Sequence, residues 1–183
     1  MWILSAAVVI FGVLTTLNLI LTLGVLKRLR EQSEQLAKTA VAEQVEDPLL
    51  SAGETPGDFA NTTIDGEPVS RDDVTGARLV AFLSPLCDRC EAQIPGLLDA
   101  ARSMLGGRDN VLVVIVGKDE KAGEYAERFR DVAKVVIEPG NGPITKEFRL
   151  TGLPAFALLD PFGKVVTSSI AIDRLDIPVA SSA

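Results

Sequence analysis

Short apolar runs alternate with helical patterns along the second half of the chain. The runs at residues 78–84, 110–117 and 133–138 are aliphatic and rich in β-branched residues, which is typical of strands covered on both faces. Apolar residues at helical spacing follow the first two runs, from Cys90 to Leu105 and from Glu120 to Val132. This order predicts strands joined by helices.

The pattern changes after the third strand. Residues 142–150 predict a short helix, and residues 154–170 form two alternating runs around a Pro-Phe-Gly turn, which indicates a β-hairpin. Strand–helix–strand order followed by a hairpin predicts an α/β fold with one mixed central sheet and helices on both of its faces.

The N-terminal segment has a different composition. Residues 2–26 carry no charged side chain, and as a helix they would be roughly 37 Å long, enough to cross a hydrocarbon core of about 30 Å. No basic residue precedes the run, as one would in a cleaved signal peptide. We therefore expect a single transmembrane anchor at residues 1–26, a helical stalk or linker at 27–50 and one domain at 51–183. The alternative is a buried helix of a soluble domain, which would need a large protein around it.

The charges bear on orientation and on partners. Lys27, Arg28 and Arg30 follow the apolar run, and the positive-inside rule would therefore place the C-terminal domain in the cytoplasm. The whole chain has a formal net charge of −7 at pH 7. This balance argues against nucleic acid as a partner and against a polybasic contact with anionic lipid.

The chain has two cysteines, Cys87 and Cys90, and no histidine. Structural zinc usually takes four Cys or His ligands, so we expect no metal site within one chain, and a four-thiolate site shared by two chains is the metal alternative. The lack of histidine excludes a Cys–His nucleophile pair and a Ser–His–Asp triad. A disulfide that closes two intervening residues removes little chain entropy and is a poor structural staple. The spacing favours a redox-active pair.

The position of the pair supports redox chemistry. Cys87 directly follows a predicted strand and stands where a helix begins, and there the helix dipole and free N–H groups stabilise a thiolate. We expect Cys87 to attack a substrate disulfide and Cys90, one helical turn later, to resolve the mixed disulfide. Between them, Asp88 disfavours a thiolate and Arg89 favours one.

Three pieces of sequence carry a resemblance to a known family: "PGDF" with "DGEPVS", the strand and C-x-x-C with Pro95 behind it, and "TGLPAFALLDPFGKVV". With them, residues 53–170 resemble the membrane-anchored thioredoxin-like proteins of the TlpA/ResA group, and "SPLCDRC" is similar to the MauD-type form of the motif. The resemblance implies a thioredoxin-like fold, a lead-in hairpin and a cis bond between Leu153 and Pro154 beside the cysteines. It also implies that the Leu153 backbone pairs with an extended substrate segment, and Pro95 would bend the helix.

The sequence departs from the family pattern around the cysteines. Leu86 stands where family members often have Trp, Ala81 where thioredoxin has a buried Asp, and Gln93 where the ResA-like group has Glu. The residues expected to tune the redox properties of the pair are Asp88, Arg89, Gln93 and Pro95.

These observations predict a membrane-tethered thiol–disulfide oxidoreductase that reduces disulfides of partner proteins. The Cys87–Cys90 disulfide would be its redox centre, without a cofactor, and a membrane or soluble thiol would donate the electrons. The resemblance implies an extracytoplasmic domain, against the charge rule. Two alternatives remain: a thioredoxin-fold binding or assembly module without turnover, and a peroxiredoxin-like peroxidase. In this chain Val80 and Ser84 occupy the Pro and Thr positions of the peroxiredoxin pattern P-x-x-x-T-x-x-C.

Overall fold

The computed structural model describes residues 2, 12, 48–73, 78–118 and 120–178. The chain divides into two units, Met1–Val45 and Glu46–Ala183, and the fold described below belongs to the second. Among the described residues, no helix has the length and apolar character needed to cross a membrane. Nearly all of the predicted anchor and of the predicted linker lies outside the described ranges, so both stay predictions.

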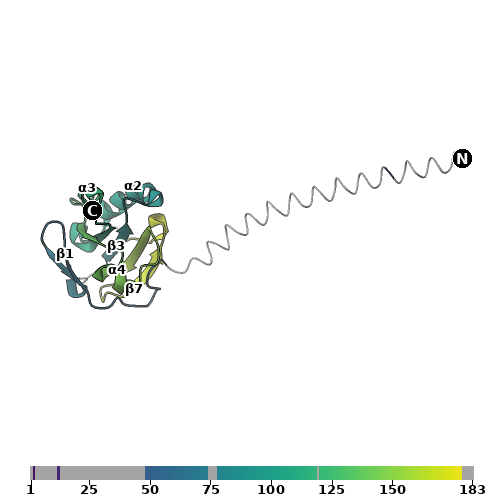
Figure 1. Ribbon diagram of the computed structural model, residues 1–183. Coiled ribbons are helices and arrows are strands. Elements are labelled where there is room, and N and C mark those ends of the chain that lie inside the picture. The colour runs from purple at the N-terminus through teal and green to yellow at the C-terminus, as the bar shows by residue number, and fades with distance from the viewer. Residues whose placement is uncertain (1, 3–11, 13–47, 74–77, 119, 179–183) are drawn as a thin grey trace. The chain divides into compact units, whose positions relative to one another are not determined.

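A five-stranded mixed sheet, in the order β5-β4-β3-β6-β7, forms the centre of the domain (Figure 1). The strands β3, β4 and β5 are parallel, β6 is antiparallel to β3, and β7 is antiparallel to β6. This confirms the predicted mixed sheet and its C-terminal hairpin. The strands are β3 (Arg78–Leu83), β4 (Val111–Val116), β5 (Lys134–Glu138), β6 (Ala155–Leu159) and β7 (Val165–Ser169).

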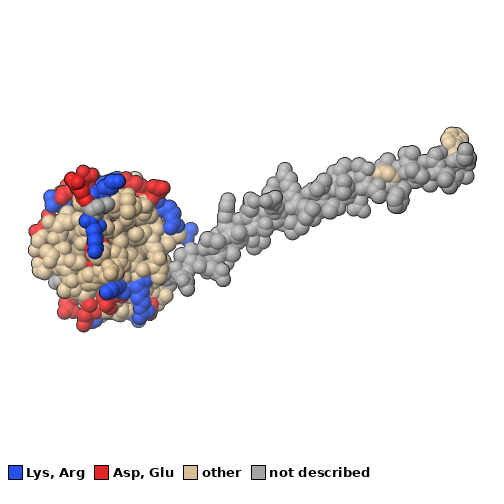
Figure 2. Space-filling model, in the orientation of Figure 1, with Lys and Arg blue, Asp and Glu red and all other residues tan. Residues whose placement is uncertain are grey.

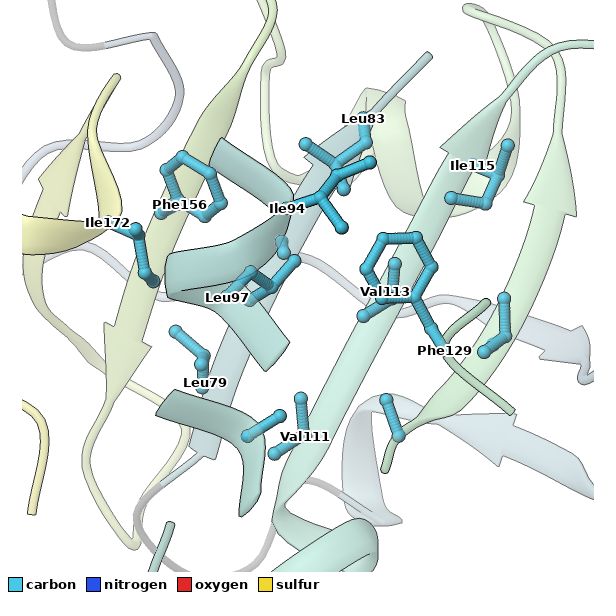
Figure 3. Close-up of a cluster of buried hydrophobic side chains, with 14 of the residues drawn as sticks. Leu79, Leu83, Ile94, Leu97, Val111, Val113, Ile115, Phe129, Phe156 and Ile172 are labelled. Carbon is cyan, nitrogen blue, oxygen red and sulfur yellow. The ribbon is translucent and has the colours of Figure 1, made fainter. Parts of the chain in front are cut away.

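Helices cover both faces of this sheet, as the sequence predicted. On one face, Leu79 and Leu83 of β3 pack with Ile94 and Leu97 of α2 (Asp88–Ser103), as Figure 3 shows. Successive residues of a strand point to opposite faces, so Val80 and Phe82 of β3 belong instead to a second cluster with Ile144 and Phe148, at α4 (Pro143–Glu147). Each such side chain contributes about 1.5–3 kcal/mol when fully buried.

The helix between β4 and β5 is shorter than its sequence pattern predicted. The helix α3 spans Glu120–Glu127, and the chain continues in tighter turns, in which the N–H of Phe129 donates to the carbonyl of Ala126 at 3.0 Å. Phe129 is fully buried in the cluster shared by α2 and α3. Beyond β7, the described chain forms a 3-10 turn, η3 (Ile172–Arg174).

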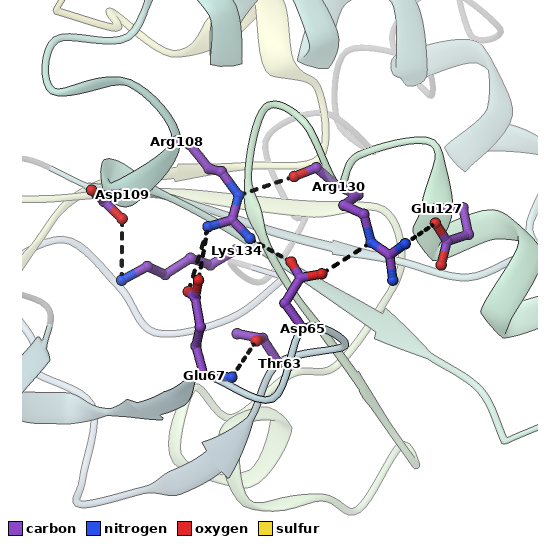
Figure 4. Close-up of polar contacts among 8 residues, drawn as sticks. All are labelled: Thr63, Asp65, Glu67, Arg108, Asp109, Glu127, Arg130 and Lys134. Carbon is purple, nitrogen blue, oxygen red and sulfur yellow. Dashed lines mark hydrogen bonds and ion pairs between the residues drawn. The ribbon is translucent and has the colours of Figure 1, made fainter.

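The predicted lead-in hairpin is present as β1 (Ala60–Thr62) and β2 (Pro68–Ser70), which pair antiparallel. Its turn is fixed to the sheet edge by the N–H of Ile64, which donates to the carbonyl of Val135 at 2.8 Å. Charged side chains reinforce this contact (Figure 4), because Arg130 pairs with Asp65 at 3.0 Å. Arg108 contacts both acidic residues of the turn, Asp65 and Glu67.

The packed domain begins before residue 51. Leu49 and Leu50, which lie within the predicted linker, are 4% and 2% exposed and belong to the cluster at α4. The N–H of Leu50 donates to the carbonyl of Phe148 at 3.0 Å. Two adjacent leucines at the end of a charged helical pattern gave no periodic signal, so this contact could not be read from the sequence.

Candidate functional site

Cys87 lies at the junction between β3 and α2, where it is the N-cap residue of the helix. The turn before it is held by Ser84, whose carbonyl accepts from the N–H of Cys87 at 3.2 Å and whose hydroxyl accepts from the N–H of Leu86 at 3.4 Å. The carbonyl of Cys87 accepts from the N–H of Cys90 at 2.9 Å, which closes the first helical turn. The strand, the turn and the helix thus place the Cys87 thiol at the positive end of α2.

The two cysteines have different environments. Both carry free thiols; Cys87 is partly exposed, whereas Cys90 is fully buried in the cluster between the sheet and α2. Burial raises the pKa of Cys90 to about 12, and a hydrogen bond with Cys87 adds to the effect, because both favour the neutral thiol. Cys90 is therefore protonated at neutral pH, and Cys87 is the thiol that a substrate can reach.

A cis peptide bond joins Leu153 and Pro154, as the resemblance implied. The antiparallel register of β3 with β6 pairs Phe82 with Ala155, so the segment leading into β6 lies at the same end of the sheet as the turn before Cys87. Leu153 is partly buried and packs against both core clusters. Its predicted role in substrate docking stays a prediction.

The two residues between the cysteines differ in their contacts. Both are exposed. Arg89 donates from Nη2 to the carbonyl oxygen of Leu153 at 3.0 Å, which joins α2 to the segment before the cis-proline. The Arg89 charge also lowers the pKa of Cys90, although burial outweighs it. Asp88 forms no ion pair with another described residue, and it stands in the first turn of α2, where the helix dipole favours a carboxylate.

Gln93 and Pro95 lie further along α2. The side-chain oxygen of Gln93 accepts from the N–H of Ile172 at 3.0 Å and so ties α2 to η3. Gly96 allows this approach, since a Cβ there would stand 2.9 Å from Cγ2 of Ile172. Pro95 is exposed within the helix. The predicted redox-tuning roles of Gln93 and Pro95 stay predictions.

Tyr125 is a neighbour of the site that sequence reasoning did not single out. It lies on α3, is 7% exposed and belongs to the same cluster as Cys90. Its hydroxyl is buried and has no hydrogen-bond partner among the described residues, and burial together with the nearby Cys90 raises its pKa. Arg128 lies over its ring at 5.3 Å and pairs with Glu91 of α2 at 2.8 Å. The sequence held one indication of this position: Tyr125 carries a phenol on the apolar face of the helix predicted for residues 120–132.

A metal site would need several donor side chains brought together by the fold. Among the described residues, no group of three or more Cys, Asp or Glu side chains is placed to hold a metal ion. Cys87 and Cys90 provide two thiol ligands to any such site. What the pair can do with its own atoms is exchange a disulfide, because one sulfur is accessible and the other stands within hydrogen-bonding distance of it.

Comparisons with known proteins agree with this architecture. No protein-family model matches the chain. One curated relative, "Probable nucleoredoxin 1" of Arabidopsis thaliana, is 24% identical over 157 residues, covering 84% of this chain. The match spans 26% of the nucleoredoxin, about a quarter of its length.

Several solved structures have a similar backbone. They include the thioredoxin domain of a thiol-disulfide oxidoreductase from Bacteroides vulgatus, with a TM-score of 0.55, 20% identity and coverage of 67% of this chain and 90% of that one. A thiol:disulfide interchange protein from Chlorobium tepidum has a TM-score of 0.54, 19% identity and coverage of 67% and 88%. A thiol:disulfide interchange protein from Bacteroides sp. has a TM-score of 0.53, 20% identity and coverage of 69% and 85%. The chain therefore has the thioredoxin-like fold, with its two cysteines at the N-terminus of α2.

Proposed function

We propose that this chain is a thiol–disulfide oxidoreductase that reduces disulfides of partner proteins through Cys87 and Cys90. The observation that carries the proposal is the asymmetry of the pair at the start of α2: Cys87 is partly exposed and Cys90 is fully buried. The names of the structural neighbours support the same activity. No cofactor is required, because the two sulfur atoms themselves carry the electrons.

The chemistry proceeds in two exchanges. The thiolate of Cys87 attacks one sulfur of the substrate disulfide, forms a mixed disulfide and releases the first substrate thiolate. Cys90 then loses its proton and attacks the sulfur of Cys87, which releases the second substrate thiolate. Two electrons pass to the substrate, its two thiolates take up two protons, and the Cys87–Cys90 disulfide remains. A thiol donor returns the pair to the reduced state.

The surroundings of Cys87 suit a protein substrate. Leu86, directly before it, is 78% exposed and offers an apolar contact. The backbone of Leu153 offers pairing to an extended chain. We propose that the substrate disulfide lies between these two elements.

We further propose where the protein acts: anchored in a membrane, with its domain on the extracytoplasmic side. Residues 2–26, without a charged side chain, support a membrane anchor. The resemblance to the TlpA/ResA group, with a MauD-type motif, supports an extracytoplasmic domain with disulfide-bearing substrates there. Labelling of Cys87 by a membrane-impermeant thiol reagent in intact cells tests the orientation, and labelling that requires permeabilisation would place the domain inside.

A second candidate is a binding or assembly module that uses the same fold without turnover. The high pKa of Cys90 favours it, because a resolving thiol that rarely loses its proton slows the second exchange.

Reduction of insulin by the full chain, with dithiothreitol as the electron donor, tests the oxidoreductase proposal. We expect turnover by the wild type and none by Cys87→Ser or Cys90→Ser. Turnover that survives in Cys87→Ser would overturn the proposal. A wild type that is inactive but binds partner proteins would support the module, and consumption of hydrogen peroxide faster than reduction of insulin would support a peroxidase.

A further inference from the structure

Arg89 is set apart from other arginines of the domain by its partner. Six described arginines form ion pairs with Asp or Glu side chains: Arg71, Arg102, Arg108, Arg128, Arg130 and Arg149. Arg89 instead donates to the backbone carbonyl of Leu153, and it makes no ion pair with a described residue. Arg89 is exposed, and the bond to Leu153 is its one hydrogen bond to a described residue, so a charged group with unused donors stands beside the cysteines.

The carbonyl that Arg89 contacts belongs to the segment proposed to dock substrate. Leu153 precedes Pro154, and neither the N–H of Leu153 nor that of Gly152 donates to another described backbone group. An extended chain that accepts from these N–H groups and donates to the Leu153 carbonyl would share that carbonyl with Arg89 or displace its guanidinium. In either case the guanidinium lies next to the docked chain, one residue before Cys90.

A guanidinium has five N–H donors in a planar fork that matches a carboxylate. One of them is used at Leu153. The carboxylates nearest to Arg89 in the sequence do not pair with its remaining N–H donors. Glu91 pairs with Arg128 at 2.8 Å, and Asp88 forms no ion pair with a described residue. On the face drawn in Figure 2, basic and acidic side chains are interspersed, so no extended field of one sign dominates that surface.

We infer that Arg89 determines substrate specificity: it holds the docking carbonyl in the free protein and pairs with an acidic side chain close to the substrate cysteine on docking. The inference rests on the proposed oxidoreductase function and adds a substrate class, disulfides flanked by Asp or Glu. Asp88 has the opposite effect. Its exposed carboxylate stands between Cys87 and Cys90 in the sequence, and it repels an acidic chain.

A competition between peptides tests the inference. Two peptides, each with a single cysteine and oxidised to its disulfide dimer, differ only in carrying Glu or Lys on both sides of the cysteine. The full chain is reduced, freed of reductant and mixed with each peptide. The released thiol peptide is then measured after acid quenching. Reduction of both peptides by dithiothreitol corrects for their intrinsic reactivity.

The wild type should reduce the Glu peptide roughly two- to fivefold faster than the Lys peptide, a ratio in the range of an exposed ion pair. Arg89→Gln should bring the ratio to one or below, because the Asp88 carboxylate remains, and Arg89→Glu should invert it. Asp88→Asn should increase the preference for the Glu peptide. High salt should reduce the preference, because exposed charges are screened.

Arg102→Glu is the matched control. It makes the same charge change on the same helix, roughly 20 Å from Arg89 along the axis, and it should leave the wild-type ratio unchanged. Equal rates for the two peptides in the wild type, or a wild-type ratio retained by Arg89→Glu, would overturn the inference and leave the proposed function standing. Failure of the wild type to reduce either peptide would instead count against the proposed function.

Discussion

The side-chain oxygen of Gln93 accepts a hydrogen bond from the backbone N–H of Ile172, 3.0 Å away. The contact joins the helix that carries both cysteines to the 3-10 turn after β7, 79 residues later in the chain. Ile172 is 7% exposed, so its N–H has little access to water if the partner is removed. Gln93 therefore has a structural role at the position where the ResA-like group has Glu.

We expect Gln93→Ala to lower the free energy of unfolding by about 1 kcal/mol, because it leaves the N–H of Ile172 without its acceptor. Urea unfolding of the reduced protein measures the change. Gln93→Glu retains an acceptor oxygen and should stay close to the wild type at pH 7. An unchanged unfolding midpoint in Gln93→Ala would show that the bond contributes nothing.

The difference in burial between Cys87 and Cys90 predicts unequal reactivity. Brief treatment of the reduced, folded protein with iodoacetamide at pH 8 should modify Cys87 and leave Cys90 intact, because Cys90 is fully buried and its pKa is raised to about 12. Peptide mass mapping identifies the modified residue. In denaturant both residues should react. Equal labelling of the two cysteines in the folded protein would be incompatible with the geometry of the pair.

The raised pKa of Cys90 also predicts a pH dependence of stability. The ordinary pKa of the thiol is 9.0 and that of folded Cys90 is about 12, so the folded state keeps this proton more tightly than the unfolded state. The resulting stabilisation is complete below pH 9 and is lost as the pH rises from 9 to 12. Its slope is at most about 1.4 kcal/mol per pH unit.

Urea unfolding of the reduced protein at pH 8 and pH 10.5 checks this sign. The wild type should lose more stability over this interval than Cys90→Ser, which lacks the titrating thiol. Equal losses in the two proteins would contradict the raised pKa. A larger loss in Cys90→Ser would reverse its direction.

The parts of the fold that local pattern specifies were predictable from the sequence. Runs such as residues 110–117 are apolar on both faces, and only a strand between two layers buries both, so β4 and its neighbours followed directly. The hairpin of β6 and β7 followed from alternation around a Pro-Phe-Gly turn. The placement of Cys87 at a helix start followed from the strand before it and the helical spacing after it.

The contacts that distinguish this site could not be predicted in the same way. Arg89 and Leu153 are 64 residues apart, and their hydrogen bond depends on the backbone path of the segment before β6. The contact of Gln93 depends on where the chain goes after β7. The position of Tyr125 against Cys90 depends on how two helices pack on one sheet. None of these has a local period or motif, so only the assembled fold brings the groups together.

The most direct test of the central claim is the fate of a disulfide peptide mixed with each single-cysteine variant of the full chain. Intact mass measurement should find Cys90→Ser carrying one peptide, joined through Cys87, because the resolving thiol is absent and the mixed disulfide persists. Cys87→Ser, with its remaining thiol buried, should carry none. No adduct on Cys90→Ser, or an adduct that forms as fast on Cys87→Ser, would contradict the assignment of Cys87 as the attacking thiol.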